Sequence, residues 1–221
     1  MLLLATDTSG KLGSIALAQC TSGEVCKVLE IVPLEGGTFS AQLIPQIAAL
    51  LSRHGLGKLD LGVFAVVSGP GSFTGLRVGL AAIKALAEIL NKPIVAVSLL
   101  EAIAVSAPDT GNVLAAMDAG RGEVYVAEYE VGPPALMPRE HLLTRAELLA
   151  AAHHRPIVTP DVSIAEFARA SHLTVLEVER PRSDAIARLA WEKLKNHQTV
   201  SADALEANYI RRSDAEIFSA K

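Results

Sequence analysis

The order of strand-like and helix-like segments is the feature that most constrains the fold of this chain. Three strand-like runs joined by short turns come first, and two further strands then alternate with helices. Short turns predict an antiparallel meander, whereas strands separated by helices pair in parallel. The strands are expected at residues 2–6, 13–19, 24–32, 63–67 and 94–97, with helices over 40–54, up to about residue 90, and from 98 onward.

The second half of the chain repeats this order in a trimmed form. Strand-like runs at 113–117 and 123–129 predict a hairpin around the turn DAGRG, and Thr144 with Glu147 forms a capping box at a helix start. Further strands are expected at 157–159 and 174–178, a long helix from Ser183, and one more strand near Tyr209. We therefore expect an α/β protein with two lobes, residues 1–108 and a reduced second lobe at 109–221, whose tail could pack back on the first.

Composition narrows the classes of protein. The 221 residues carry a net charge of −4, and this acidic balance predicts weak binding to nucleic acid by the chain alone. The opening residues form an apolar strand without a basic leader, and no apolar run reaches the length of a membrane helix, so a cytoplasmic protein is expected. Cys20 and Cys26 could face each other across a hairpin, but in the cytoplasm we expect two reduced, half-buried residues.

Two turns combine acidic and small residues after a strand, one in each half. They hold Asp7, Thr8 and Ser9, and Asp118 and Gly120. Exposed backbone N–H groups in such turns can bind an anion, and the pair resembles the phosphate motifs of the actin, hexokinase and heat-shock chaperone ATPases. The alternative is an ordinary hairpin whose Asp and Ser bond to their own backbone.

Other sequence features argue against stand-alone catalysis. An adenosine pocket in that superfamily needs a late glycine-rich turn, but the last glycine here is Gly132, so a free-standing ATPase or kinase is disfavoured. The six histidines show no metal-binding spacing, and no GxSxG nucleophile elbow is present. We predict no catalytic residue, no metal site and no tightly bound cofactor.

A stripe of small residues marks the segment after the fourth strand. Gly71, Gly75 and Gly79 lie four residues apart and continue into a helix, where glycine costs about 1 kcal/mol relative to alanine. Three readings remain open: packing on the chain's own sheet, a phosphate site at the helix start, and a subunit interface. The wide apolar face of the first helix favours the interface. The predicted interface residues are Leu43, Ile47, Leu50, Gly71, Phe73, Gly75, Leu76, Val78, Gly79, Ala82 and Ile83.

Several motifs together resemble the TsaB family, also called YeaZ. They are ATDTS at residues 5–9, SGPGSFTGLRVGLAAIKALA at 68–87, VSLLEA at 97–102, AMDAGRGEVYVAEY at 116–129 and YIRRSDAE at 209–216. The resemblance covers nearly the whole chain. It implies the two-lobed actin-like fold, with a ribonuclease-H-like sheet flanked by helices in each lobe.

The resemblance also implies a function. TsaB-like proteins are non-catalytic subunits that pair with the transferase TsaD through helices of the first lobe and form homodimers through the same helices. With the ATPase TsaE, the pair transfers a threonylcarbamoyl group to the adenosine beside the anticodon of transfer RNA. ATP is then used by the complex, and tRNA is bound through the complex only.

The sequence departs from the family pattern at two positions. Phe39 stands where the family often has histidine, and Ala207 where it often has proline before the Tyr-x-Arg tail. Two other functions stay open at this point: a stand-alone ATP-dependent phosphotransferase using Asp7 and Asp118, and an inactive homologue of the M22-type peptidases.

Overall fold

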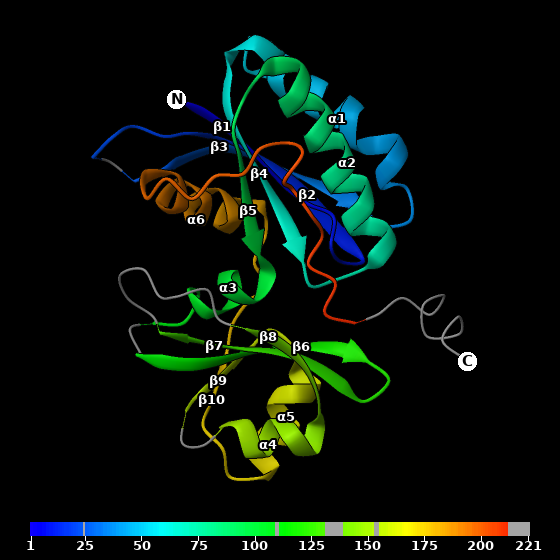
Figure 1. The fold of residues 1–221 in the computed structure, drawn as a ribbon, viewed down its shortest axis with the longest axis vertical. Helices are drawn as coiled ribbons and strands as arrows, with labels where there is room; N and C mark the ends of the chain where they lie inside the picture. The colour runs from blue at the N-terminus through cyan, green and yellow to red at the C-terminus, as the bar shows by residue number, and fades with distance from the viewer. Residues whose placement is uncertain (24, 109–110, 131–138, 153–154, 212–221) are drawn as a thin grey trace. The chain divides into compact units, whose positions relative to one another are not determined.

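The protein is described by a computed structural model that covers residues 1–23, 25–108, 111–130, 139–152 and 155–211 (Figure 1). Its contacts divide the chain into two compact units. The first unit combines Met1–Ser98 with Arg182–Asn208, and the second combines Leu99–Pro181 with the chain from Tyr209 onward. Each unit is built around its own five-stranded sheet.

The first sheet has the strand order β3-β2-β1-β4-β5. β1 pairs antiparallel with β2 and β2 with β3, whereas β4 lies parallel to β1 and β5 parallel to β4. This confirms the predicted meander followed by parallel strands. The bounds are β1 Leu2–Asp7, β2 Leu12–Gln19, β3 Lys27–Glu35, β4 Leu61–Gly69 and β5 Ile94–Ser98.

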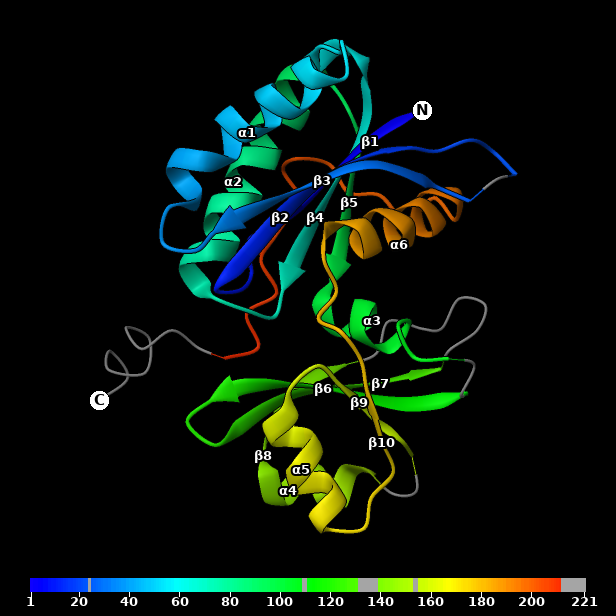
Figure 2. The ribbon, with the colours of Figure 1, turned by 180° about the vertical axis from the view of Figure 1, so that it is seen from behind.

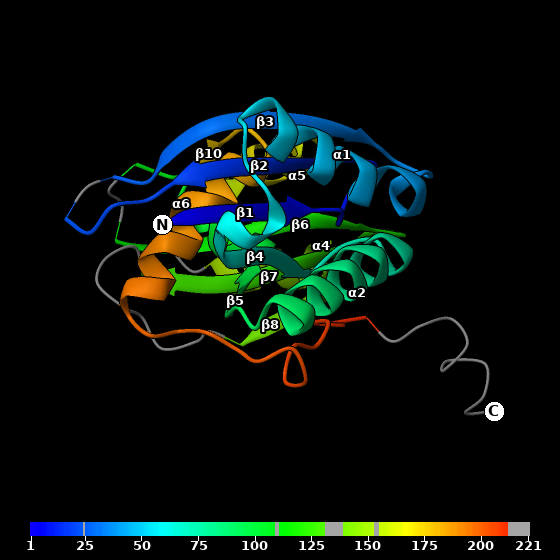
Figure 3. The ribbon, with the colours of Figure 1, turned by 90° about the horizontal axis from the view of Figure 1, so that it is seen from above.

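Helices cover both faces of the first sheet (Figures 2 and 3). Successive side chains of a strand point to opposite faces, and Thr8, directly after β1, bonds to α2 through Gly75. Ser14, which pairs with Asp7 in the ladder, bonds instead to Ser183 of α6. α1 and α2 therefore lie on one face and α6 on the other. The bounds are α1 Phe39–Arg53, α2 Phe73–Leu90 and α6 Ser183–Lys195, with a 3₁₀ turn at Lys58–Asp60.

The second sheet repeats the topology of the first. Its order is β10-β9-β6-β7-β8, with β6, β7 and β8 antiparallel and with β9 and β10 parallel to β6. The sequence analysis missed β8, because its residues Glu-His-Leu-Leu-Thr follow no regular alternation. The bounds are β6 Asn112–Gly120, β7 Glu123–Glu130, β8 Glu140–Thr144, β9 Ile157–Thr159 and β10 Val175–Glu177, with helices α4 Arg145–Ala152 and α5 Val162–Ala170.

Each unit receives the helix that follows the last strand of the other unit's sheet. α3, Leu99–Ala104, follows β5 but packs on β6 and β7, and α6 follows β10 but packs on β1 and β2. The contacts thus change unit at Ser98 instead of at residue 108, and the chain returns to the first unit at Arg182. Both helices are needed there because each covers an apolar sheet face that would otherwise meet water.

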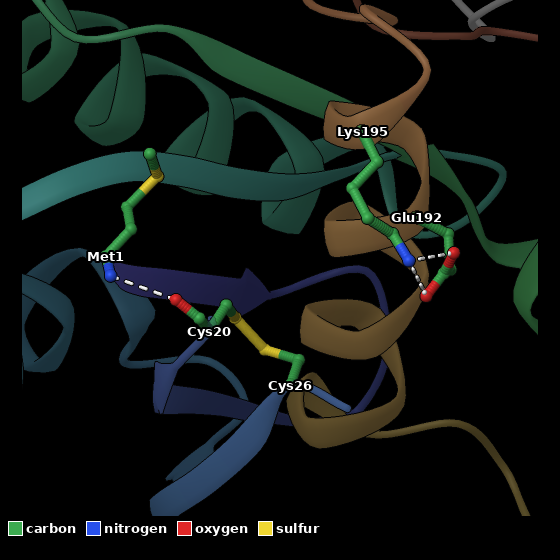
Figure 4. Close-up of a disulfide and its surroundings, with 5 residues drawn as sticks. All are labelled: Met1, Cys20, Cys26, Glu192 and Lys195. Carbon is green, nitrogen blue, oxygen red and sulfur yellow. Dashed lines mark hydrogen bonds and ion pairs between the residues drawn. A yellow bond between two sulfur atoms is a disulfide. The ribbon is translucent and has the colours of Figure 1, made fainter. Parts of the chain in front are cut away.

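The cysteines differ from the prediction. Cys20 and Cys26 are both buried and form a disulfide that closes the β2–β3 hairpin (Figure 4). Cys20 also exchanges two backbone hydrogen bonds with Met1, each 2.9 Å long. The expectation of reduced, half-buried thiols is therefore wrong, because the hairpin register brings the two residues together where the ladder ends at Gln19 and Lys27.

The segment after α6 runs along the first unit without forming a helix. Val200 makes an isolated antiparallel bridge to Ile94 at the edge of the sheet, and the Asn208 N–H donates to the Ser68 carbonyl at 2.8 Å. The strand predicted near Tyr209 is absent from the described residues. The later part of the predicted tail motif, from residue 212, lies outside them.

Candidate functional site

The turn after β1 is closed by its own side chains. The Ser9 N–H and hydroxyl both donate to Asp7 Oδ1, at 2.8 and 2.6 Å, and all three residues from Asp7 to Ser9 are buried. An anion-binding turn instead offers its N–H groups to a ligand. The geometry matches the alternative of a hairpin that bonds to its own backbone.

Helix α2 seals this turn from the other side. Thr8 Oγ1 donates to the Gly75 carbonyl at 2.7 Å, and the Ser72 N–H donates to the Ser9 carbonyl at 2.7 Å. A Cβ atom at Gly75 or Gly79 would come closer than 3.0 Å to Thr8. A Cβ at Gly71 would lie 2.5 Å from the Ser9 carbonyl oxygen.

The small-residue stripe therefore permits close approach between α2 and the chain's own first turn. Only residues without a Cβ fit against a backbone at such distances. Packing within the chain accounts for all three glycines, which let the start of α2 lie against Thr8 and Ser9.

The turn after β6 has the opposite character. Asp118 is exposed, and its N–H donates to Asp161 Oδ2 at 2.7 Å. Gly120, Arg121 and Gly122 follow in the left-handed region, with φ of 73°, 59° and 79°. Their conformation turns the chain from β6 into β7, which resume pairing at Gly120 and Glu123.

An arginine from the tail binds this second turn. Arg211 Nη1 donates to the Ala119 carbonyl at 2.8 Å, and Nη2 donates to the Gly120 carbonyl at 3.2 Å and forms an ion pair with Glu123. Tyr125 lies close by: burial raises the pKa of its hydroxyl, while the charges of Arg211 and Glu123 act on that pKa in opposite directions. Of the predicted turn residues, Gly120 thus binds a cation of the same chain, whereas Asp118 bonds through its N–H to Asp161.

The described residues contain neither a candidate metal site nor a candidate membrane helix. No group of three or more His, Cys, Asp or Glu side chains there is placed to hold a metal ion. None of the helices in that part of the chain has both the length and the apolar character to cross a membrane.

Comparison with known proteins identifies the family. A family model described as TsaD, tRNA N6-adenosine threonylcarbamoyltransferase, matches residues 31–184. A protein of Escherichia coli named tRNA threonylcarbamoyladenosine biosynthesis protein TsaB is 36% identical over 133 residues, and its counterpart in Bacillus subtilis is 34% identical over 131 residues. The chain belongs to the TsaD family, in its TsaB group. The matched region covers 59% of this chain but only 55% and 56% of these two relatives, so the chain aligns with about half the length of each.

A solved structure supports the TsaB-type fold over a longer stretch. It is described as an uncharacterized protein from Pseudomonas aeruginosa with similarity to peptidase YEAZ. It superposes with a TM-score of 0.75 at 25% identity and covers 95% of this chain and 99% of its own. The predicted fold class, a two-lobed actin-like protein with ribonuclease-H-like sheets, is confirmed.

The residue that departs most clearly from the TsaB pattern has a structural explanation. Phe39 opens α1, is 5% exposed and packs over β2, where a Cβ at Gly13 would lie 2.8 Å from its ring. An aromatic ring thus fills the space that the missing side chain of Gly13 leaves. Ala207, the second departure, is half-buried one residue before Asn208.

The predicted interface residues fall into two groups in this TsaB-type fold. The buried group faces the chain's own core and cannot touch a partner directly. The partly exposed group consists of Gly71, just before α2, and three residues of that helix, of which Phe73 has the Arg77 guanidinium 3.7 Å from its ring centroid. The buried residues are Leu43, Ile47, Leu50, Gly75, Leu76, Gly79 and Ile83, and the half-buried ones are Gly71, Phe73, Val78 and Ala82.

Apolar side chains are nevertheless exposed on both helices, beside the exposed charged residues Arg77 and Glu88 of α2. Ile44 and Ala48 are exposed on α1, and Ala81, Ala85 and Ile89 are exposed on α2. We call these five residues the outer helix face. A helix with apolar residues on more than one side does not reveal in its sequence which side the sheet will cover, so the buried and exposed residues of these stripes could not be told apart beforehand.

Proposed function

We propose that the chain is a non-catalytic subunit in the biosynthesis of threonylcarbamoyladenosine on tRNA, acting in the cytoplasm. In this proposal it pairs with a TsaD-like transferase and forms a homodimer when alone. A TsaE-like ATPase joins the pair, ATP is used by the complex, and tRNA is bound through the complex only. The names of the relatives support this role, since TsaB proteins of Escherichia coli and Bacillus subtilis match 133 and 131 residues of the chain.

The closed first turn is the observation that carries the non-catalytic part of the proposal. A nucleotide-binding turn needs free N–H donors for the phosphates. Here the Ser9 N–H bonds to Asp7, and α2 covers Thr8. Such a turn holds α2 in place by packing. In this proposal α2, together with α1, presents the outer helix face to a partner.

The outer helix face supports the choice of interface. Ile44 and Ile89 are 47% and 75% exposed, and the exposed alanines add apolar surface, with the charged Arg77 and Glu88 one helical turn from Ala81 and Ala85. Interface cores are depleted in charged residues. A charge in the middle of such a face would have to be buried without a partner, which is costly.

Co-purification with a TsaD-like protein, followed by a threonylcarbamoyl transfer assay with and without the chain, tests the proposal. We expect transfer to require the chain. Ile44→Asp should abolish both pairing and stimulation, whereas the control Val162→Asp, at a 61% exposed position on α5, should leave both intact. Transfer at full rate without the chain would contradict the proposal.

Calorimetry of the isolated chain with Mg-ATP separates this function from a stand-alone phosphotransferase. We expect no heat of binding in the micromolar range, because the donors of the first turn are already used. A micromolar site would contradict the non-catalytic role and favour the enzyme.

A further inference from the structure

The turn between β6 and β7 has the properties of a binding site that its own chain occupies. Three oxygen acceptors converge on the Arg211 guanidinium: the carbonyls of Ala119 and Gly120 and the carboxylate of Glu123. Both terminal nitrogens of the planar guanidinium thus donate to acceptors at fixed positions. This arrangement selects arginine over lysine. We propose that this turn is an arginine-binding site, that Arg211 is its resident ligand, and that an arginine side chain of another protein can replace it.

The site does not depend on the tail for its shape. Gly120, Arg121 and Gly122 hold the turn through their left-handed backbone, and the β6–β7 ladder extends to Glu123. The three acceptors therefore stay close together when the guanidinium leaves. A preorganised site pays little free energy for rearrangement when a new ligand enters.

The site is also accessible. The side chains of Arg211 and Glu123 are 21% and 37% exposed, so a competing guanidinium can approach from solvent. Asp118 is exposed at the start of the same turn, and its N–H is bonded to the Asp161 carboxylate. The turn also carries the exposed Arg121, but once Arg211 has left, the three carboxylates of Asp118, Glu123 and Asp161 outnumber it, and this excess of negative charge attracts a cation.

The segment that carries Arg211 is suited to exchange. Residues 205–211 form neither helix nor strand, and the Asn208 N–H holds the chain to the Ser68 carbonyl three residues earlier. Release of Arg211 therefore requires no loss of regular secondary structure. Arg211 stays covalently part of the same chain after its release, so it competes as a tethered ligand.

The proposal goes beyond the role in tRNA modification, and its test uses the full chain alone. N-acetyl-L-arginine amide is titrated into the Arg211→Ala variant, with backbone amide NMR shifts as the readout and N-acetyl-L-lysine amide as the matched control. We expect saturable shifts at Ala119–Glu123 with millimolar affinity, and binding of the lysine analogue weaker by about tenfold. The wild-type chain should need a much higher concentration, because the tethered Arg211 competes.

Glu123→Gln in the Arg211→Ala background should abolish the shifts, because it removes the only carboxylate that contacts the guanidinium in the described residues. Equal shifts with arginine and lysine amides, or shifts located elsewhere, would overturn the proposal. Unfolding of both Arg211→Ala and Arg211→Lys would overturn it as well, since Arg211 would then be a fixed part of the second unit. These outcomes are independent of partner pairing through α1 and α2.

Discussion

The two turns that follow the first strand of each sheet look alike in sequence and differ in the fold. Both place an aspartate before small residues, and both strands occupy the centre of sheets with the same order. The turn at Asp7–Ser9 is buried under α2, whereas the turn at Asp118–Gly122 is largely exposed and bound by a distant arginine. The first turn is part of the core, whereas the carbonyl acceptors of the second turn face a side chain from the tail.

The difference comes from the helices and not from the turns themselves. Gly75 and Gly79 let α2 approach Thr8 within contact distance. The corresponding helix of the second unit, α5, has no glycine in its sequence VSIAEFARA and cannot approach its turn in that way. A short motif therefore has no fixed role. Whether its polar groups are buried in contacts within the chain depends on how closely the neighbouring helix packs on it.

The largest effect is expected from filling the glycine stripe. Gly75→Leu places a side chain where even a Cβ would overlap Thr8, and we expect the free energy of unfolding to fall by about 3 kcal/mol. The control Ala81→Leu, on the exposed side of the same helix, should change it by less than about 0.5 kcal/mol. Chemical denaturation measures both. Equal effects would mean that α2 does not seal the first turn.

The two aspartates provide a direct contrast. Asp7→Asn weakens two hydrogen bonds inside a buried turn, and the expected loss of unfolding free energy is about 2 to 3 kcal/mol. Asp118→Asn, at an exposed side chain, should cost less than about 0.5 kcal/mol. The same denaturation experiment applies, and a larger loss from Asp118→Asn would reverse the comparison.

The disulfide between Cys20 and Cys26 joins the end of β2 to the start of β3, at the opposite end of β2 from the first turn. Cys26→Ser opens a closed loop between residues separated by six positions, and the expected loss of stability is about 2 kcal/mol. The double variant with Cys20→Ser should lose no more than the single one. Thiol labelling of the unreduced wild-type chain should find no free cysteine. Two labelled thiols would show that the disulfide is absent.

The smallest effect is expected at the surface of the second unit, where Thr144 and Glu147 form the predicted capping box. The hydrogen bonds from the Thr144 N–H and hydroxyl lower the pKa of the Glu147 carboxyl from its ordinary value of 4.5. A lowered folded-state pKa contributes stability above the unfolded-state value, and this contribution is lost as pH falls through the folded-state value.

Glu147→Gln should therefore lower Tm slightly at neutral pH, and the difference from wild type should shrink as the pH drops below 4.5. Thermal melts of both chains from neutral to acidic pH measure it. A difference that grows toward low pH would contradict the assignment.

Much of the fold could be predicted because local patterns and tertiary structure agree. Alternating and β-branched runs predict nine of the ten strands found in the described residues, with ends that differ by up to three residues. The capping box at Thr144 correctly predicted the start of α4. β8 lacked such a pattern, and its place at the sheet edge comes from pairing with β7.

The site was harder to predict because its contacts join residues far apart in the chain. Arg211 lies 92 positions from Ala119, and Ser183 lies 169 positions from Ser14. A serine at a helix start can cap its own helix, but the Ser183 hydroxyl donates to the Ser14 carbonyl at 2.6 Å instead. A serine at a helix start gives no signal in sequence about which of these bonds it will make.

The exchange of helices between the two units has a consequence for synthesis on the ribosome. Residues 1–98 contain every strand of the first sheet, yet one face of that sheet stays without its helix until residues 183–195 have emerged. The second sheet, in contrast, already has α3 when its strands appear. The part of the chain that is made first therefore finishes folding last, and a nascent chain that stalls before α6 would expose an apolar sheet face to chaperones and to other chains.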